Sequence, residues 1–269
     1  MHARIMGILN VTPDSFSDGG EWFALDRAVE HARTLIGEGA HILDIGGEST
    51  RPRAEPVAID EELRRVVPVV RALRGADVQI SIDTAKLTVA EAAVDAGATF
   101  VNDVTAFRHE PELAGFVADR RCDCCLMHML GEPRTMQDDP RYDDVVDDVR
   151  AFLEERVEFA VREGVREERI MVDPGIGFGK TLEHNLELLR RLDRIATIGL
   201  PVVIGTSRKS FLGRLTGRED PHDRVAATVA TTVLALERGA SVFRVHDVAP
   251  TRDALAVATA TLRADGARG

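Results

Sequence analysis

The stretch DPGIGFGKT, from Asp173 to Thr181, combines three glycines with a lysine and a threonine, which are residue types that hold nucleotide phosphates. The phosphate-loop pattern GxxxxGK(S/T) requires a glycine at the position that Pro174 occupies. The dinucleotide pattern GxGxxG also fails, because Gly179 follows Gly177 one residue too early. The stretch is therefore not a nucleotide-binding loop by pattern, and other residues have to explain it.

Eight separate apolar runs end in residues that are mostly polar. These ends are Asn10, Asp44, Asp83, Asn102 with Asp103, His128, Asp173, Gly205 with Thr206, and His246. Taken singly, each residue is explained as a helix cap or a turn former. Taken together they predict one shared pocket, because hydrophobic strands have no packing reason to end so regularly in carboxylates, amides or imidazoles.

Three carboxylates and one amide in such a pocket restrict what it binds. Asp44, Asp83 and Asp173 bring like charges together beside Asn102, which indicates a metal or a ligand with many hydrogen-bond donors. A hard metal prefers several oxygen ligands, whereas an amino-heterocycle with adjacent N–H groups matches bidentate carboxylates. The residues leave both alternatives open.

Positive charge follows the seventh and eighth apolar runs. GTSRKSF (205–211) places Arg208 and Lys209 beside serine hydroxyl groups, among them Ser210. FRVHDV (243–248) places Arg244 and His246 on one strand face, since residues i and i+2 point the same way. Barrels often bind phosphate near their seventh and eighth loops, so these groups predict an anion site.

Two long polar loops, NVTPDSFSDGG (10–20) and GGESTRPRAEP (46–56), follow the first two runs. Phe16 supplies an apolar side chain there, and Asp18 and Arg51 supply charge. Loops of this length in a compact fold are typical of functional lids. The alternative interpretation is that they are surface insertions that the fold tolerates.

A recurring phrase indicates the fold that positions these residues. An amphipathic stretch, a Gly-Ala pair and an apolar run occur at 37–47, 95–104 and 237–248, with Gly39, Gly97 and Gly239 placed as left-handed helix caps. Further apolar runs cover 4–10, 78–83, 122–129, 169–175 and 200–207, with helical patterns between them. Eight buried strands alternating with helices predict one (β/α)8 TIM barrel over 1–269, with a doubly wound open sheet as the alternative.

Composition excludes several classes of protein. The net charge of −11 has no basic stripe to bind nucleic acid. No uncharged apolar run reaches the roughly 18 residues of a membrane span, and the N-terminus leaves no room for a signal peptide, so a cytoplasmic protein without membrane contact is expected. The clustered Cys122, Cys124 and Cys125 lie in a strand-like run, which predicts that at least one of them is a buried small hydrophobe, rather than a disulfide framework or a zinc site.

Successive motifs resemble those of the dihydropteroate synthase family, in that family's order and spacing over essentially the whole chain. They are MGILNVTPDSFSDGG, DIGGESTRP, SIDT, NDV, LMHM with GEPRTMQ, DPGIGFGKT, GTSRKSFLG and FRVHDV. The resemblance implies a (β/α)8 barrel, usually a homodimer, that joins 6-hydroxymethyl-7,8-dihydropterin diphosphate to p-aminobenzoate with Mg²⁺. The implied products are 7,8-dihydropteroate and diphosphate, in folate synthesis, at a site that sulfonamides target.

The resemblance also implies roles for individual residues. The pterin is expected among Asp83, Asn102, Asp173 and Lys209, with Arg244 against its ring. The other implied contacts are Thr50, Arg244 and His246 at the diphosphate, Asn10 at Mg²⁺, Phe16, Phe178 and Ser210 around p-aminobenzoate, and Asp18 and Arg51 on the first two loops. Asp83, Lys209, Asp18 and Arg51 form the implied catalytic group.

In this interpretation the functional residue of DPGIGFGKT is its first residue, Asp173, rather than the glycines. Asp173 is expected to bind the pterin, while Pro174 and the glycines turn the chain and bring Phe178 over the pocket. Lys180 and Thr181 are expected to begin the next helix.

The implied mechanism needs little proton chemistry. Mg²⁺ and cationic groups stabilise the departing diphosphate, and the aniline nitrogen attacks the resulting methylene cation near Asp83 and Asp18. Three alternatives remain from the sequence: a pterin-binding methyltransferase, a pterin binder without turnover, and an unrelated phosphate-binding barrel enzyme. One departure is Arg53, since family members usually read STRPGA where this chain reads STRPRA.

Overall fold

Eight short strands alternate with helices in the computed structural model, which describes residues 3–12, 20–49, 54–132 and 134–265. The strands are β1 (Arg4–Asn10), β2 (Ile42–Gly46), β3 (Gln79–Asp83), β4 (Phe100–Asp103), β5 (Asp123–Met127), β6 (Ile170–Asp173), β7 (Val203–Ile204) and β8 (Val242–Val245). Every strand pair in the sheet is parallel, as the alternation with helices requires.

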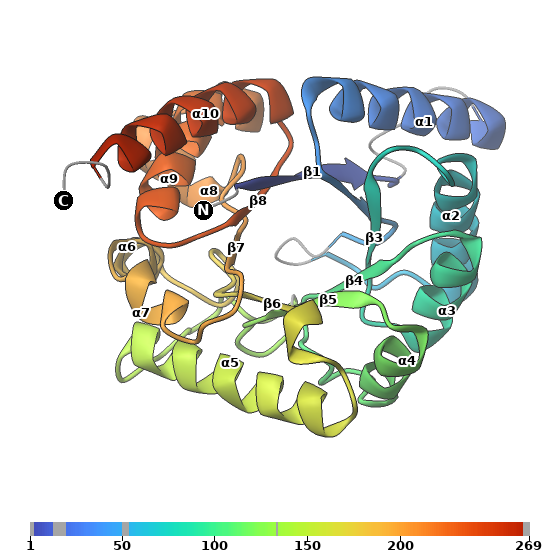
Figure 1. The fold of residues 1–269 in the computed structure, drawn as a ribbon, viewed down its shortest axis with the longest axis horizontal. Coiled ribbons are helices and arrows are strands. Elements are labelled where there is room, and N and C mark those ends of the chain that lie inside the picture. The colour runs from blue at the N-terminus through green and yellow to red at the C-terminus, as the bar shows by residue number, and fades with distance from the viewer. Residues whose placement is uncertain (1–2, 13–19, 50–53, 133, 266–269) are drawn as a thin grey trace.

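The helices form a ring around the strands (Figure 1). They are α1 (Gly20–Glu38), α2 (Ile59–Ala72), α3 (Leu87–Ala96), α4 (Glu112–Arg120), α5 (Val145–Arg162), α6 (Leu182–Arg190), α7 (Leu192–Ala196), α8 (Ser210–Thr216), α9 (Val225–Glu237) and α10 (Val248–Asp265), with 3-10 turns η2 (Glu167–Arg169) and η3 (Pro221–Arg224). None of the described helices has the length and apolar character that a bilayer crossing requires.

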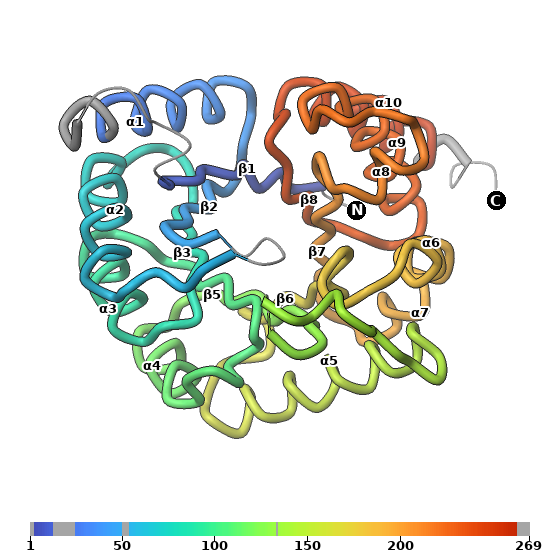
Figure 2. The backbone as a smooth tube through the Cα atoms, turned by 180° about the vertical axis from the view of Figure 1, so that it is seen from behind, coloured from blue at the N-terminus to red at the C-terminus, as the bar shows by residue number. Residues whose placement is uncertain are grey.

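The sheet closes on itself, which confirms the predicted barrel and excludes the open doubly wound alternative. Its strand order is β6-β5-β4-β3-β2-β1-β8-β7. The two ends of this order meet through a parallel bridge between Val172 and Val202, where the Val172 amide donates to the Pro201 carbonyl at 3.0 Å. Figure 2 shows the closed ring from the opposite side, with β6 and β7 next to each other.

The seventh strand is much shorter than the apolar run 200–207 predicts. Only Val203 and Ile204 form a regular strand. Pro201 has no amide hydrogen to donate to a ladder, and Gly205 already leads into the following turn. The run 200–207 is apolar because it is buried. A buried segment need not pair along its whole length as a strand.

Each strand is apolar on both faces because it separates two cores. Outward side chains join the main core under the helices, whereas inward ones form a separate apolar plug inside the barrel. The plug consists of Met6, Ile42, Phe100, Cys125, Met171, Val203 and Val242, one from each strand except β3. The prediction that at least one cysteine is buried is confirmed, and in fact all three are buried free thiols, with Cys124 facing outward and Cys125 inward.

Glycines end the helices where the repeated phrase places them. Gly39, Gly97 and Gly239 have φ angles of +107°, +135° and +98°. These angles lie in a region that side chains with a Cβ rarely adopt, so the Gly-Ala pair marks the turn from helix to strand as predicted.

Candidate active site

The carboxyl ends of the strands bring most of the predicted site residues to one rim of the barrel. Asn10, Asp83 and Asp173 are the last residues of β1, β3 and β6. Asn102 lies in β4 directly opposite Asp83 in the parallel register, and His246 follows β8. The predicted shared pocket therefore has a physical basis, because parallel strands in a barrel end on the same face.

Several predicted positions on the first two loops lie outside the described residues. They are Phe16 and Asp18 in the first loop, and Thr50, Arg51 and Arg53 in the second. Their roles stay predictions.

The guanidinium of Arg244 joins two carboxylates inside the barrel. Its Nε donates to Asp44 Oδ2 and its Nη2 to Asp83 Oδ2, each at 2.6 Å. Asp44 is completely buried and also accepts hydrogen bonds from Ser81 Oγ at 2.6 Å and Asn102 Nδ2 at 2.9 Å. Buried charges are stable only when paired and hydrogen-bonded, and this network supplies both conditions.

The position predicted for Asp44 was wrong. Asp44 is the third residue of β2, which continues through Ile45 to Gly46 because both neighbouring strands pair with it that far. The carboxylate therefore lies beneath the rim, where it holds Asn102 and Arg244, rather than at a strand end.

Crowding of carboxylates affects the protonation of Asp83. Burial raises the pKa of Asp83 to about 7, Arg244 opposes this shift, and the carboxylates of Asp44, Glu62 and Asp103 reinforce it. The site thus has a carboxylate whose charge changes near neutral pH, held 2.6 Å from a permanent cation.

Asp173 and Lys209 influence each other on the opposite side of the rim. Burial raises the pKa of Asp173, and Lys209 is the strongest opposing influence. Burial lowers the pKa of Lys209 to about 8, with Asp173 opposing and Arg244 reinforcing the shift. Because each charge favours the other, the pair retains one acceptor and one donor group for a polar ligand.

Residues 174–181, called loop 6 here, hold the aromatic ring that the sequence predicts over the pocket. Asp173 Oδ1 accepts the Gly175 amide at 2.7 Å, and Lys209 Nζ donates to the Ile176 carbonyl. Lys209 Nζ also lies 4.7 Å from the centroid of the Phe178 ring, a cation–π contact. The structure therefore brings Asp173, Phe178 and Lys209 together.

Phe178 packs on a small apolar cluster separate from the main core. Its half-buried ring contacts a group formed by Val104, Met127, Met129 and Met136. These side chains come from the ends of β4 and β5 and the segment after β5, so the ring position depends on three neighbouring loops.

The predicted helix start is correct at Thr181 and wrong at Lys180. Helix α6 begins at Leu182, and the Thr181 hydroxyl caps it by accepting the His184 amide at 3.2 Å. Lys180 precedes the cap and its side chain is only 3% exposed, because the turn before the cap directs it into the protein.

Of the two adjacent basic residues after β7, only Lys209 faces the rim. Arg208 has φ +59° and its guanidinium binds both carboxylate oxygens of Asp247, at 2.6 and 2.9 Å. The Arg208 charge is therefore already compensated, contrary to the expectation that it contributes free positive charge. Ser207 Oγ lies 2.9 Å from His246 Nδ1, which fixes the imidazole at the end of β8.

The sequence interpretation missed a lysine that joins both ends of the second long loop. Lys86 Nζ donates to Glu48 Oε2, the Val57 carbonyl and Glu62 Oε2, at 2.5 to 2.6 Å. Glu62 is fully buried and also accepts from Thr84 Oγ1 at 2.8 Å. The available signal was an acidic residue on the apolar face of α2, next to Val66 and Val69 in helical spacing.

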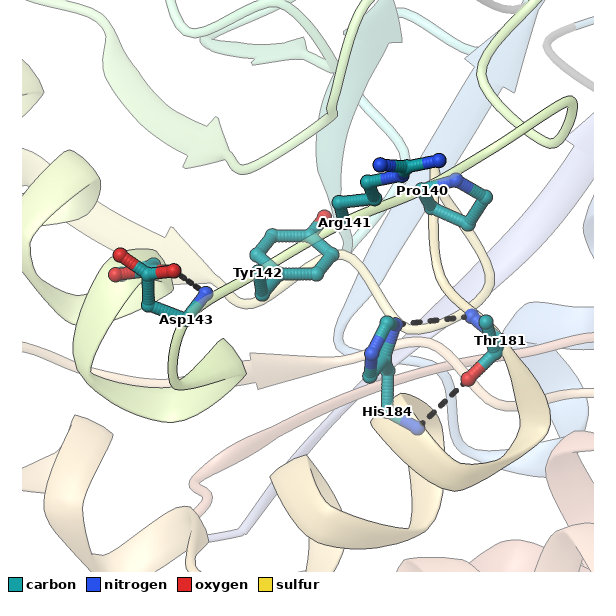
Figure 3. Close-up of a pocket in the computed structure, with 7 residues that line it drawn as sticks. Pro140, Arg141, Tyr142, Asp143, Thr181 and His184 are labelled. Atoms are coloured by element: carbon teal, nitrogen blue, oxygen red, sulfur yellow. Dashed lines mark hydrogen bonds between the residues drawn. The ribbon is translucent and has the colours of Figure 1, made fainter.

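A surface hollow of about 650 Å³ lies near the starts of α5 and α6 (Figure 3). Its lining contains none of the predicted site residues and consists of Pro140, Arg141, Tyr142, Asp143, Asp148, Thr181 and His184. Tyr142 Oη donates to the Gly179 carbonyl at 2.7 Å, so this wall supports loop 6 from a side other than the rim.

Comparison with known proteins decides the family. Residues 6–246 match the family model described as pterin binding enzyme. The dihydropteroate synthase of Synechocystis sp. is 48% identical over 91% of this chain and 85% of its own length. That of Escherichia coli is 45% identical over 98% of this chain and 93% of its own length. The chain belongs to the dihydropteroate synthases, a family of pterin-binding transferases.

Solved dihydropteroate synthase structures agree in fold. The Xanthomonas albilineans enzyme with 4-aminobenzoic acid has a TM-score of 0.91 and 50% identity, covering 97% of this chain and 93% of that one. The same organism's enzyme in complex with 7,8-dihydropteroate has a TM-score of 0.88 and 48% identity, with 97% and 94% covered. The family resemblance is confirmed, and an unrelated phosphate-binding barrel is excluded.

Replacing Gly175 with alanine should destabilise this dihydropteroate synthase by about 2 to 4 kcal/mol. Gly175 has φ +66°, and a Cβ there would lie 1.9 Å from the His128 carbonyl oxygen. Urea unfolding measures the change. Gly115→Ala in α4 is the matched control, since nothing lies within 4 Å of its added Cβ, and it should stabilise by about 0.5 to 1 kcal/mol. Equal stability of Gly175→Ala and wild type would contradict the close approach.

Asp83→Asn should change how stability depends on pH. The native pKa of about 7 exceeds the unfolded value of 3.8, so native Asp83 binds a proton more tightly. Wild-type stability should therefore fall relative to the variant as pH rises between these values, by at most about 1.4 kcal/mol per pH unit. Urea unfolding from about pH 4 to 8 tests this. The exposed Asp95→Asn should run parallel to wild type, and a pH-independent difference for Asp83→Asn would refute the expectation.

Proposed function

We propose that the rim formed by Asp83, Asn102, Asp173 and Lys209 binds 6-hydroxymethyl-7,8-dihydropterin diphosphate and joins it to p-aminobenzoate. The observation that carries the proposal is the grouping of two carboxylates, an amide and a lysine ammonium at the ends of β3, β4 and β6 and the start of α8. A pterin ring offers an amino group and N–H donors beside acceptor atoms, which this set complements.

Asn102 supports the proposal through its orientation. The Asp44 carboxylate accepts from its Nδ2, and this fixes which end of the amide is the nitrogen. One amide hydrogen is thereby used, and the carbonyl oxygen remains as an acceptor for ring donors. Asp83 similarly uses Oδ2 for Arg244, so its carboxylate is held in place before any ligand binds.

We place the diphosphate near Arg244 and His246, with Thr50 as a further predicted contact. Asn10, the half-buried last residue of β1, offers an amide oxygen, a hard ligand suited to Mg²⁺. No group of three or more His, Cys, Asp or Glu that could hold a metal occurs among the residues that the structure describes. Mg²⁺ is often bound by few protein oxygens together with substrate phosphates, so Asn10 fits an ion that binds with the diphosphate and neutralises its charge.

The proposed reaction separates charge and then forms the new bond. The C–O bond to the diphosphate breaks and its electron pair leaves with the diphosphate, giving a methylene cation conjugated with the pterin. The lone pair of the aniline nitrogen then forms the C–N bond, and a proton of that nitrogen passes to water. Asp83 stabilises the developing positive charge, and Asp18 is the second group predicted for this role.

We place p-aminobenzoate beside Phe178 and Ser210. Phe178 provides an aromatic face next to the Lys209 ammonium, and Ser210 is the exposed first residue of α8. Phe16 and Arg51 are further predicted contacts from the first two loops. An aniline nitrogen is unprotonated at neutral pH, so this subsite needs orientation rather than a general base.

The purified protein should release diphosphate from the pterin diphosphate only when p-aminobenzoate and Mg²⁺ are both present. A diphosphate-release assay with each component omitted, and with a chelator added, separates a synthase from a pterin binder without turnover or a methyltransferase. Release that is independent of p-aminobenzoate would refute the synthase assignment. In the same assay Asp83→Asn should fold but lose about 100-fold or more in turnover, whereas Asp95→Asn should match wild type.

We also propose a homodimer that uses α9 and α10. These helices pack side by side (Figure 1) and carry exposed apolar side chains, with Leu234, Val257 and Leu262 exposed by 45%, 69% and 41%. Such exposed side chains on neighbouring helices favour a protein interface. The three free buried thiols fit a reducing compartment, and we place the enzyme in the cytoplasm.

Leu234→Glu combined with Val257→Glu should convert the dimer into a monomer, because burying two carboxylates in an apolar interface is unfavourable. Light scattering coupled to size-exclusion chromatography measures the mass. Leu215→Glu, at a 52% exposed position in α8, should leave the dimer intact. A wild-type monomer, or a double variant that stays dimeric, would refute this interface.

A further inference from the structure

Lys180 is a buried lysine that the reaction described above does not use. Its Nζ donates to the Phe178 carbonyl at 2.9 Å and lies 2.9 Å from His128 Nδ1. With 3% of its surface exposed it cannot serve as a phosphate ligand, which its place in DPGIGFGKT first suggests. A buried amino group is costly unless its contacts are specific, so these contacts indicate a role.

Loop 6 encloses Lys180 by lying directly on the segment after β5. A Cβ at Gly175 would meet the His128 carbonyl oxygen at 1.9 Å, and one at Gly179 would meet Leu130 Cβ at 2.6 Å. The His128 amide also donates to the Asp173 carbonyl at 2.9 Å. Lys180 therefore links the two segments: its backbone belongs to loop 6, and its amino group contacts His128 in the segment after β5.

The His128 imidazole is held as the partner of this amino group. Its ring packs edge-on against Phe152 at a centroid distance of 4.8 Å. Burial, together with Lys180 and Arg108, lowers the pKa of His128 to about 2, so the imidazole is neutral at neutral pH. A neutral ring can present a lone pair at Nδ1 to the Lys180 amino group, and the 2.9 Å separation of the two nitrogens allows this hydrogen bond.

We propose that Lys180 is a positioning residue for both substrate subsites. Through the Phe178 carbonyl it fixes the backbone of the aromatic residue whose ring lies 4.7 Å from Lys209 Nζ. Through its charge it supports the nearby carboxylate of Asp173 at the start of the same loop. This inference rests on the proposed placement of the pterin at Asp173 and of p-aminobenzoate at Phe178.

The effect of the Lys180 charge on the pKa of Asp173 has a definite direction. The groups that act on Asp173 are Lys209 just before α8, Arg244 from β8, Lys180 from loop 6 and the Cys125 thiol from β5. Burial raises the pKa of Asp173, and the three cations oppose the rise. Burial lowers the pKa of Lys180, so its cationic form is favoured as pH falls, which is also when Asp173 takes up its proton. Removing the Lys180 charge should therefore let Asp173 protonate at higher pH.

Lys180→Met, which keeps chain length without charge, tests the inference. Calorimetric titration with 6-hydroxymethylpterin from about pH 5 to 8 reports on the pterin subsite alone. We expect binding about 10-fold weaker than wild type at the acid end, with the loss of affinity on acidification beginning at higher pH. Steady-state kinetics should show a raised KM for p-aminobenzoate, with kcat less affected.

Three further variants separate the possible outcomes. His128→Asn keeps the Lys180 charge and provides an amide oxygen as acceptor, so its pH profile should match wild type. If it shifts as far as Lys180→Met, or if Lys180→Met weakens binding equally at every pH, the charge is not the cause and the inference fails. In an Asp173→Asn background Lys180→Met should no longer shift the pH profile, whereas the acid loss of affinity that comes from Asp83 should remain. If Asp173→Asn leaves pterin affinity unchanged at every pH, the proposed pterin placement fails instead. Should Lys180→Met not fold, Lys180→Gln removes the charge while keeping a donor for Phe178.

Discussion

The buried contact of Arg244 with Asp44 and Asp83 is the constraint on which the site depends. The guanidinium comes from β8, and the carboxylates come from β2 and β3, so the interaction reaches past β1 inside the barrel. Burial raises the pKa of Asp83 to about 7; Arg244 opposes this shift, and the second carboxylate, Asp44, adds to it. A ligand that donates hydrogen bonds to Asp83 compensates the negative charge of this carboxylate.

The layering of the barrel explains why this charged group can exist in a protein interior. Below it lies the apolar plug that includes Met6, Phe100 and Met171, which contributes burial energy without polar partners. Both carboxylate oxygens of Asp44 accept hydrogen bonds, from Ser81, Asn102 and Arg244. At the rim the acceptors stand on strand ends, whose positions the ladder hydrogen bonds fix before a ligand arrives.

Sequence patterns predicted the features that depend on local burial and turn chemistry. The strands, the glycine turns and the rim residues Asp83, Asn102 and Asp173 followed from apolar runs and their polar ends. Asp44 was misplaced because an apolar pattern cannot tell where pairing with neighbouring strands stops. Arg208 and Lys209 are adjacent and equally basic, and only the positive φ of Arg208, together with Asp247, sends the two charges in different directions.

Lys180 is a further residue whose position the sequence pattern could not predict. In sequence it belongs to a glycine-rich stretch that resembles a phosphate loop, and in the structure the same glycines bury it. Gly175, Gly177 and Gly179 all have positive φ, which raises the entropy cost of ordering loop 6. Close packing of loop 6 against His128 and Leu130 offsets that cost. The same close contact excludes water around the Lys180 amino group. In that dry contact its bonds to Phe178 and His128 are stronger than they would be in water, so the glycines act on the site through the lysine that they enclose.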